Sequence, residues 1–133
     1  VSVFLLCKPL TAPATAAEIA PYFDSTAAVK LWGGISSTGV LTVNYSCTGF
    51  QGVTEKIVIR TYVEKKVAGL FWSRVDIGGN DNEWVFVSTS SSYSTTKSVT
   101  VPSKGTYRVT ATFAVYSNDG DTETIQKSFE ATY

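Results

Sequence analysis

The chain has 133 residues and a mass of 14.3 kDa, which is enough for one globular domain and at most a short additional segment. Its 11 Lys and Arg residues balance its 11 Asp and Glu residues, so the chain lacks the net positive charge that sequence-independent binding to nucleic acid or to anionic membranes requires. No His occurs, which excludes the imidazole bases of serine and cysteine hydrolases and the His ligands of most catalytic zinc sites.

The start of the chain has the pattern of a secretory signal peptide. An apolar run at residues 1–7 is followed by small residues that end at Ala17, as at a signal peptidase site. We expect a signal peptide, truncated at its start, over residues 1–17, a linker over residues 18–27, and a secreted domain over residues 28–133. The alternative is an N-terminal helix that stays attached. The apolar run is too short to cross a bilayer, so no membrane span is expected.

The rest of the chain is predicted to form short β-strands. Runs rich in Val, Ile, Thr, Tyr and Phe alternate with breaks of Gly, Asn, Asp, Ser or Pro, a pattern typical of strands and turns. A turn at residues 66–69 joins two of the runs as a hairpin. The stretch from Ser88 to Ser98 is almost entirely Ser and Thr and is compatible with a mobile loop, an edge strand or a glycan-like polar surface. The runs lie at residues 29–32, 40–47, 56–65, 70–77, 83–87, 99–101, 106–116 and 124–133.

Alternation with a period of two gives the runs one apolar face each. The clearest inward sets are Ile57, Ile59, Thr61 and Val63, and Tyr107, Val109, Ala111, Phe113 and Val115. Six or seven such strands bury their apolar faces best between two sheets. We therefore predict an all-β fold, an antiparallel two-sheet β-sandwich of about seven strands, which folds alone as a monomer.

One segment near the end of the chain resembles a known strand and turn. The stretch from Lys104 to Phe113, followed by Asn118-Asp119-Gly120, resembles the F strand and F–G turn of immunoglobulin-like and fibronectin type III domains. The resemblance implies that the Tyr107 hydroxyl is tied to nearby backbone. It also implies that Cys47 and Val109 stand where antibody domains keep their bridging cysteines. Because the second cysteine is missing, the fibronectin type III variety is favoured.

The stretch from about Thr26 to Tyr133 is also similar to an uncharacterised family of small secreted bacterial all-β proteins. The motifs that carry this likeness are Cys47-Thr48-Gly49, Ile57–Ile59, the Trp72 hairpin, Gly105-Thr106-Tyr107-Arg108 and Asp119-Gly120-Asp121-Thr122. These motifs are structural and the family brings no known activity. The resemblance therefore implies a secreted β-sandwich and no particular function.

Cys47 is the only cysteine of the predicted domain, because Cys7 belongs to the predicted signal peptide. A nucleophilic thiolate needs a positive neighbour or a base to lower its pKa, and the chain has no His to provide one. The inward phase of Cys47 on its strand favours a buried, small, apolar residue. No catalytic residue is predicted.

Two acidic turns are candidates for a calcium site. Asp81 and Glu83 follow one turn, and Asp119 and Asp121 lie in another. In a fibronectin-like arrangement both turns lie at the same end of the sandwich, together with the loop at residues 49–54, so their oxygen atoms could converge. Ca²⁺ prefers carboxylate and amide oxygens as ligands. The alternative is that these residues serve the turns themselves, since Asp and Asn tolerate left-handed backbone and cap their own amides. No other cofactor is expected.

Three aromatic residues fall on the face opposite the apolar set of their strands: Tyr62, Trp72 and Tyr116. Exposed aromatic rings in a row form a stacking platform for sugars or an anchor for a protein. The alternative is that Trp72 belongs to the core, if its strand is out of phase by one residue.

Together these features predict a secreted, non-enzymatic β-sandwich that binds an extracellular protein or polysaccharide. The loops at residues 49–54, 78–83 and 117–121 are its most available surface. The alternatives are a carbohydrate-binding module and a small exported effector, such as a toxin or a bacteriocin-like factor. An enzyme is not expected.

Overall fold

Strands account for the regular structure of residues 26–133, the part of the chain that this computed structural model describes. No helix occurs among these residues, and so none that is long and apolar enough to cross a membrane. The predicted signal peptide at residues 1–17 lies outside the described part. The strands are β3 (Thr26–Ile35), β4 (Val40–Gly49), β5 (Thr54–Val67), β6 (Phe71–Arg74), β7 (Trp84–Ser88), β8 (Ser92–Thr100), β9 (Thr106–Ser117) and β10 (Thr122–Thr132).

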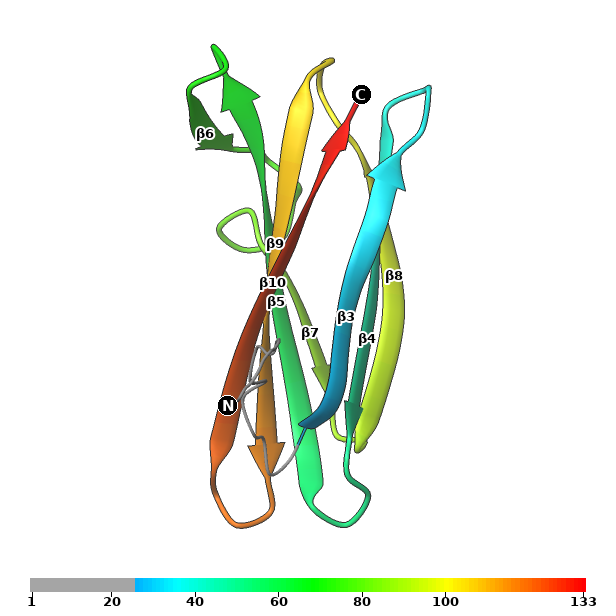
Figure 1. Cartoon of the computed structure of the whole chain (residues 1–133), viewed down its shortest axis with the longest axis vertical. Helices are drawn as coiled ribbons and strands as arrows, with labels where there is room; N and C mark the ends of the chain where they lie inside the picture. Colours follow the sequence, from blue (N-terminus) through cyan, green and yellow to red (C-terminus); the bar gives the residue numbers. More distant parts are fainter. Residues whose placement is uncertain (1–25) are drawn as a thin grey trace, which may run out of the picture.

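The strands form two antiparallel sheets that face each other (Figure 1). The three-stranded sheet has the order β3-β4-β8. The five-stranded sheet has the order β10-β9-β5, and β6 and β7 share the remaining edge of the long strand β5. Strand β7 pairs with Ile57–Thr61 and β6 with Glu64–Val67. The predicted two-sheet β-sandwich is therefore confirmed, with eight strands in the described residues in place of about seven.

The core lies between the sheets and is filled by every second residue, as the alternation predicts. All the predicted inward residues of β5 and β9 are buried. Strand β4 contributes Leu41, Val43, Tyr45 and Cys47 from the opposite sheet. The Tyr45 ring packs edge-on against Phe113, with 6.3 Å between the ring centres. Because the phase of each strand follows from local alternation, the sequence was sufficient to identify this core.

A buried pair of hydroxyl groups spans the two sheets. The hydroxyls of Tyr45 on β4 and Thr61 on β5 lie 2.7 Å apart and are hydrogen-bonded. Thr61 is fully buried, so this bond removes the cost of an unpaired polar group in an apolar core. Burial raises the pKa of Tyr45 to about 12, against a smaller lowering effect of the Thr61 bond.

Tyr107 has the backbone contacts that the immunoglobulin-like resemblance implies. Its hydroxyl donates to the Ser103 carbonyl and accepts a hydrogen bond from the Ser103 N–H, 3.4 Å away. The ring itself is fully buried. Tyr107 therefore fixes the loop before β9 to the core. Cys47 and Val109 are also buried on the facing strands β4 and β9.

One side of the sandwich is closed by β3 and β10, which are edge strands of different sheets (Figure 1). The Thr26 hydroxyl donates to the Glu123 carboxylate at 3.0 Å. Gly33 lies against Phe129, where an added Cβ would come within 2.9 Å of the Phe129 ring. β3 begins at Thr26, two residues before the predicted start of the domain.

One segment differs from its sequence prediction, and for a second segment the structure selects one of the predicted alternatives. The run at residues 70–77 was predicted as one strand, but β6 ends at Arg74, because β7 occupies the same edge of β5 from Thr61 to Ile57. The Ser/Thr-rich run is an edge strand, since β8 pairs with β4 alone among the described strands. Its hydroxyls bond across to β4, as in the Thr96 bond to the Asn44 side chain at 2.9 Å.

Candidate binding surfaces

The three aromatic residues predicted to bind a ligand lie on the outer face of the five-stranded sheet but do not form a row. Tyr116 is level with Lys56 on β5, while Tyr62 lies six residues farther along the same strand, about 20 Å away at the usual rise of a strand. Trp72 pairs with Lys66, about 13 Å beyond Tyr62. The structure therefore does not bring the three rings together.

Each of these rings has a positively charged group against it. This arrangement is a cation–π contact, and it occupies a ring face that would otherwise be open to a ligand. The guanidinium carbon of Arg74 lies 4.4 Å from the centre of the Tyr62 ring and that of Arg108 lies 4.3 Å from Trp72, while Lys56 Nζ lies 4.4 Å from Tyr116 and Lys66 Nζ 5.5 Å from Trp72.

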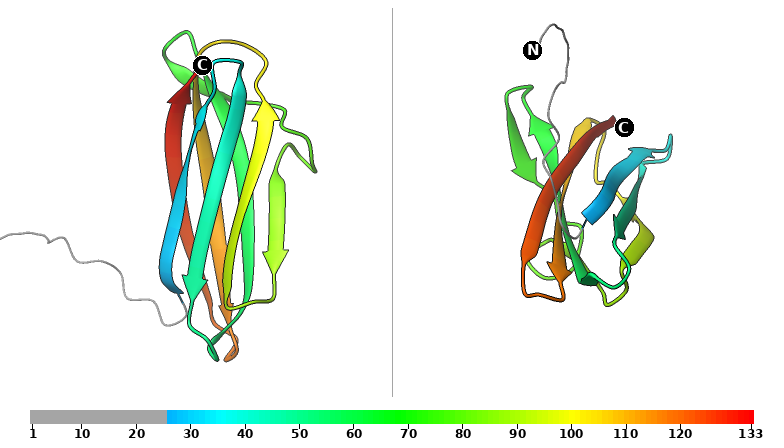
Figure 2. Two further views of the ribbon diagram at one scale, coloured as in Figure 1. Left: turned by 90° about the vertical axis from the view of Figure 1, so that its right-hand side faces the viewer. Right: turned by 60° about the horizontal axis from the view of Figure 1, so that its bottom comes forward.

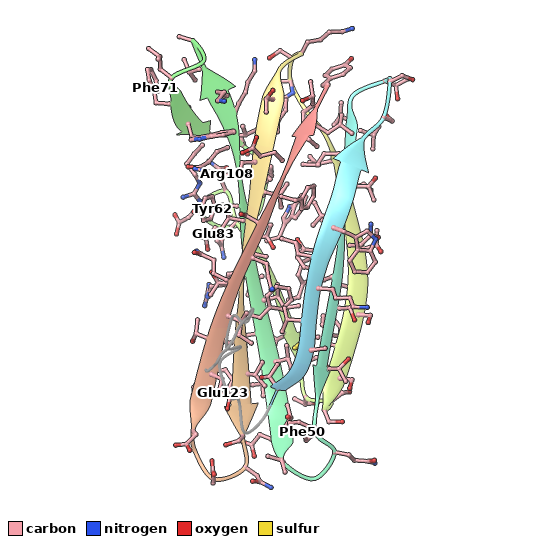
Figure 3. All side chains as sticks on the ribbon, viewed as in Figure 1. Phe50, Tyr62, Phe71, Glu83, Arg108 and Glu123 are labelled. Carbon is pink, nitrogen blue, oxygen red and sulfur yellow. The ribbon has the colours of Figure 1, made fainter. Side chains whose placement is uncertain are left out.

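The same arginines form ion pairs on the half of this face nearer the β5–β6 hairpin, where Figure 3 labels Arg108, Tyr62 and Glu83. Arg108 donates from Nε and Nη2 to one oxygen of Glu64, at 3.1 and 2.8 Å. Arg74 lies 3.7 Å from Glu83, which is also 3.9 Å from Arg60. Arg74 donates in addition to the Asp81 carbonyl at 3.2 Å. This charged network ties the β6–β7 connection to the sheet, so its groups are engaged within the protein itself.

The four residues predicted to bind calcium are divided between two places, which corrects the expectation that their turns converge. Glu83 lies beside Arg60 and Arg74 on the sheet face. Asp119 and Asp121 lie in the β9–β10 turn, at the end of the molecule shown lowest in Figure 1. Among residues 26–133, no group of three or more His, Cys, Asp or Glu side chains could hold a metal ion. The two acidic turns lie apart because Glu83 precedes Trp84, which pairs with Thr61 midway along β5, whereas the β9–β10 turn follows Ser117, which pairs with Thr54 at the start of β5.

The β9–β10 turn uses its acidic residues for its own structure. The Ser117 hydroxyl and then the Asp121 N–H donate to the Asp119 carboxylate, and these two bonds hold the pKa of Asp119 below its ordinary value. The loop at residues 49–54 does lie beside this turn, as predicted, since the Asn118 side chain donates to the Gly52 carbonyl at 2.6 Å. These contacts support the interpretation that the Asp119 carboxylate serves the turn itself, and Asp121 contributes its backbone N–H and carbonyl to the same turn.

Cys47 is 1% exposed and lies in the apolar core. Burial raises the pKa of its thiol to about 11, which keeps the sulfur protonated and unreactive at neutral pH. The interpretation of Cys47 as a small core residue is therefore supported.

The lower half of the same outer face carries an apolar patch, which we call the β7 patch and define as Val58, Val85, Val87 and Ala114. Val85 and Val87 are 44% and 60% exposed. Cross-strand pairing places Val58 beside Val87 on one side and Ala114 on the other. The patch lines a shallow hollow of about 430 Å³, whose rim is formed by polar and amphipathic residues: Lys56, Arg60, Thr112, Tyr116 and Thr124.

Sequence reasoning missed the β7 patch, although the run Trp84-Val85-Phe86-Val87 carries a signal for it. A continuous apolar run indicates a strand that is apolar on both faces. Trp84 is buried, with its indole N–H donating to the Ile77 carbonyl at 2.9 Å. Val85 and Val87 must then point outward. That they remain uncovered depends on the tertiary structure.

Strand β7 has a free edge beside this patch. Within the described part of the chain it pairs with β5 alone, and Figure 2 shows it as the outermost strand in the left view. A second hollow of about 490 Å³ borders the same strand on its other side, with Trp84, Phe86 and Lys97 among its lining residues. Unpaired backbone groups of an edge strand are a template for another strand.

Comparison of the chain with models of known protein families and with curated proteins finds no match. A function for this protein is therefore inferred from the geometry of these surfaces.

Proposed function

We propose that this protein is a secreted, non-enzymatic, monomeric binding module that captures an extended segment of a protein partner along β7. The observation that carries the proposal is the exposure of Val85 and Val87 on an edge strand with one unpaired side. An added strand hydrogen-bonds to the free edge and places alternate side chains on the β7 patch. The hollow lined by Trp84, Phe86 and Lys97 leaves room beside β7, and the shallow hollow over the β7 patch can receive a side chain of the bound segment.

A protein partner fits this surface better than a polysaccharide does. Sugar recognition by stacking needs open aromatic faces, whereas Tyr62, Trp72 and Tyr116 each carry a cation against the ring. Aliphatic side chains next to free backbone groups are the chemistry of strand addition. The proposal that no reaction is catalysed is supported by the buried, protonated Cys47 and by the absence of His from the chain.

The strand order supports a fibronectin type III-like arrangement as part of this proposal. Strands β3, β4 and β8 would correspond to the A, B and E strands, and β10, β9 and β5 to G, F and C. The Tyr107 contact at the start of β9 agrees with this correspondence. Secretion remains a proposal based on the pattern of residues 1–17.

Selection of peptides from a random display library tests the proposed function. The full chain is the target, and each selected peptide is then measured against a Val85→Lys, Val87→Lys double variant. We expect affinity to fall at least tenfold, because lysine side chains obstruct the apolar patch and oppose strand addition. The matched control, Ser94→Lys with Ser98→Lys on edge strand β8, should bind the peptides as the unmodified protein does.

Two results would contradict the proposal. One is a selection that yields no binding peptide, or peptides that bind the β7 double variant as tightly as the unmodified protein. The other is retention of the protein on polysaccharide that is lost in Trp72→Ala or Tyr116→Ala, which would favour the carbohydrate-binding alternative.

A further inference from the structure

The tip of the β5–β6 hairpin holds apolar side chains in solvent, away from the β7 patch. Leu70 is 81% exposed and Phe71 57% exposed. The turn is tight, because Ala68 and Gly69 both have positive φ and the Leu70 N–H donates to the Val67 carbonyl at 3.0 Å. Leu70 and Phe71, which we call the hairpin tip, therefore stand on a defined turn that projects from one end of the molecule (Figures 1 and 3).

Three lysines lie at the same end of the molecule as the hairpin tip. Lys65 and Lys66 come directly before the last residue of β5, and Lys66 Nζ lies over the Trp72 ring. Lys104 belongs to the neighbouring β8–β9 loop, which lies against the hairpin because Lys65 Nζ donates to the Ser103 hydroxyl at 2.6 Å. The nearest acidic side chain along β5 is Glu64, and Arg108 neutralises it. This end of the molecule is therefore both apolar and positively charged.

The opposite end has the reverse charge. Asp119 and Asp121 lie in the β9–β10 turn, and Glu55 and Glu123 lie near the starts of β5 and β10. Lys56 is the one lysine beside these four carboxylates in the described strands β5, β9 and β10. The two ends therefore differ in the sign of their charge, although the chain as a whole has a net charge of zero. The net charge of the chain does not describe the hairpin end.

We propose that the hairpin tip docks the protein on an anionic lipid bilayer as a peripheral contact. Leu70 and Phe71 would enter the interfacial layer, and Lys65, Lys66 and Lys104 would lie over the lipid headgroups, where each lysine strengthens binding about fivefold. Trp72, half-buried just behind the tip, is at the level where amphipathic rings favour the interface. The acidic end points away from the bilayer, so the charge separation orients the molecule.

A bilayer fits this surface better than a second copy of the chain. The tip is convex and every copy carries the same three lysines, so two tips repel each other. The acidic end also exposes apolar residues, Phe50 and Val53, which makes head-to-tail pairing of two copies the competing outcome. This inference uses a different surface from the proposed peptide site on β7, and the two can fail independently.

Sedimentation of the full chain with vesicles tests the proposal. We expect binding to vesicles that contain phosphatidylserine, no binding to vesicles of phosphatidylcholine alone, and release by salt. Leu70→Ser with Phe71→Ser should weaken binding at least tenfold, and Lys66→Ser with Lys104→Ser about 25-fold. The matched control, Phe50→Ser with Val53→Ser, removes two exposed apolar residues from the acidic end and should bind as the unmodified protein does.

Fluorescence gives a second measurement on the same proteins. In a Trp32→Phe background, Trp72 is the only partly exposed tryptophan of the described residues, since Trp84 is buried. Brominated phosphatidylserine should quench it when vesicles are added. The proposal is overturned if phosphatidylserine vesicles do not bind the protein, if the control loses as much binding as the tip variant, or if ultracentrifugation shows dimers that the tip variant abolishes while vesicles stay unbound.

Discussion

The guanidinium carbon of Arg108 lies 4.3 Å from the centre of the Trp72 ring. The same guanidinium donates two hydrogen bonds to Glu64. One arginine of β9 therefore holds the β6 hairpin against β5 from the outside of the sheet. The Arg108 and Glu64 side chains are 34% and 16% exposed, so water screens this ion pair only in part. Because Trp72 lies outside the core, its contact with Arg108 is what positions the ring.

Replacing Arg108 should destabilise the hairpin. Arg108→Ala is expected to lower the free energy of unfolding by about 1–2 kcal/mol, from the lost hydrogen bonds to Glu64 and the lost contact with Trp72. Arg108→Lys should recover less than half of the stability that Arg108→Ala loses, because a lysine ammonium lacks the planar, forked donors with which the guanidinium makes two hydrogen bonds. Urea unfolding of Arg108→Ala, Glu64→Gln and the double variant should give a coupling energy of about 1 kcal/mol. Additive effects would show that the pair is not coupled.

Two adjacent glycines of β3 should differ strongly in how much an alanine substitution destabilises the protein. A Cβ at Gly33 would lie 2.0 Å from the Thr42 carbonyl oxygen of β4, which is backbone and cannot move aside cheaply. Gly33→Ala is therefore expected to cost about 2 kcal/mol. Gly34 has no atom within 4 Å of an added Cβ, so Gly34→Ala should change stability by at most about 0.5 kcal/mol. Thermal unfolding of the two variants side by side checks this, and equal effects would contradict the close approach at Gly33.

Stability should fall in alkali because of the two buried weak acids. Burial raises the pKa of Cys47 from 9.0 to about 11 and that of Tyr45 from 10.0 to about 12. The unfolded chain releases these protons at lower pH than the folded chain, so their contribution is complete below pH 9 and is lost as pH rises through 11 and 12. Urea midpoints across this range measure the loss.

The variant Cys47→Ala separates the contributions of Cys47 and Tyr45 to the loss of stability in alkali. Because the thiol is removed, only Tyr45 contributes, and stability should begin to fall near pH 10. An unchanged pH profile in Cys47→Ala would mean that the thiol is not protected in the folded state.

Calcium should leave the melting temperature unchanged. Glu83 is engaged by Arg60 and Arg74, while Asp119 accepts hydrogen bonds within its own turn. A ligand that binds only the folded state raises its stability, so calorimetry with calcium and with a chelator measures the effect directly. A calcium-dependent rise that is lost in Asp119→Asn with Asp121→Asn would contradict this expectation.

The prediction of the core succeeded because it depends on local order along the chain. The inward residues of β5 and β9, from Ile57 to Val115, follow from a side-chain period of two, which every strand obeys whatever its neighbours are. For Ser88–Ser98 the sequence left three alternatives open, of which an edge strand was one. The pairing of β8 with β4 shows that most of this segment is an edge strand.

Prediction of the surface was less complete, because a surface depends on which strands are neighbours. Trp72 and Arg108 are far apart in sequence and meet only because β6 and β9 flank β5 on opposite sides. The strand predicted over residues 70–77 is shorter because β7 occupies the rest of the same edge of β5, a competition that alternation alone does not reveal.

The amino-acid sequence by itself determined the all-β class, the phase of the strands and the identity of the core, since these follow from local alternation and turn residues. Tertiary structure alone decided that Glu83 lies apart from Asp119, that Val85 and Val87 stay uncovered, and that Lys104 lies at the same end as Lys65 and Lys66. The physical reason is that strand order and direction bring distant residues together, and neither is encoded in the spacing of residues along one strand.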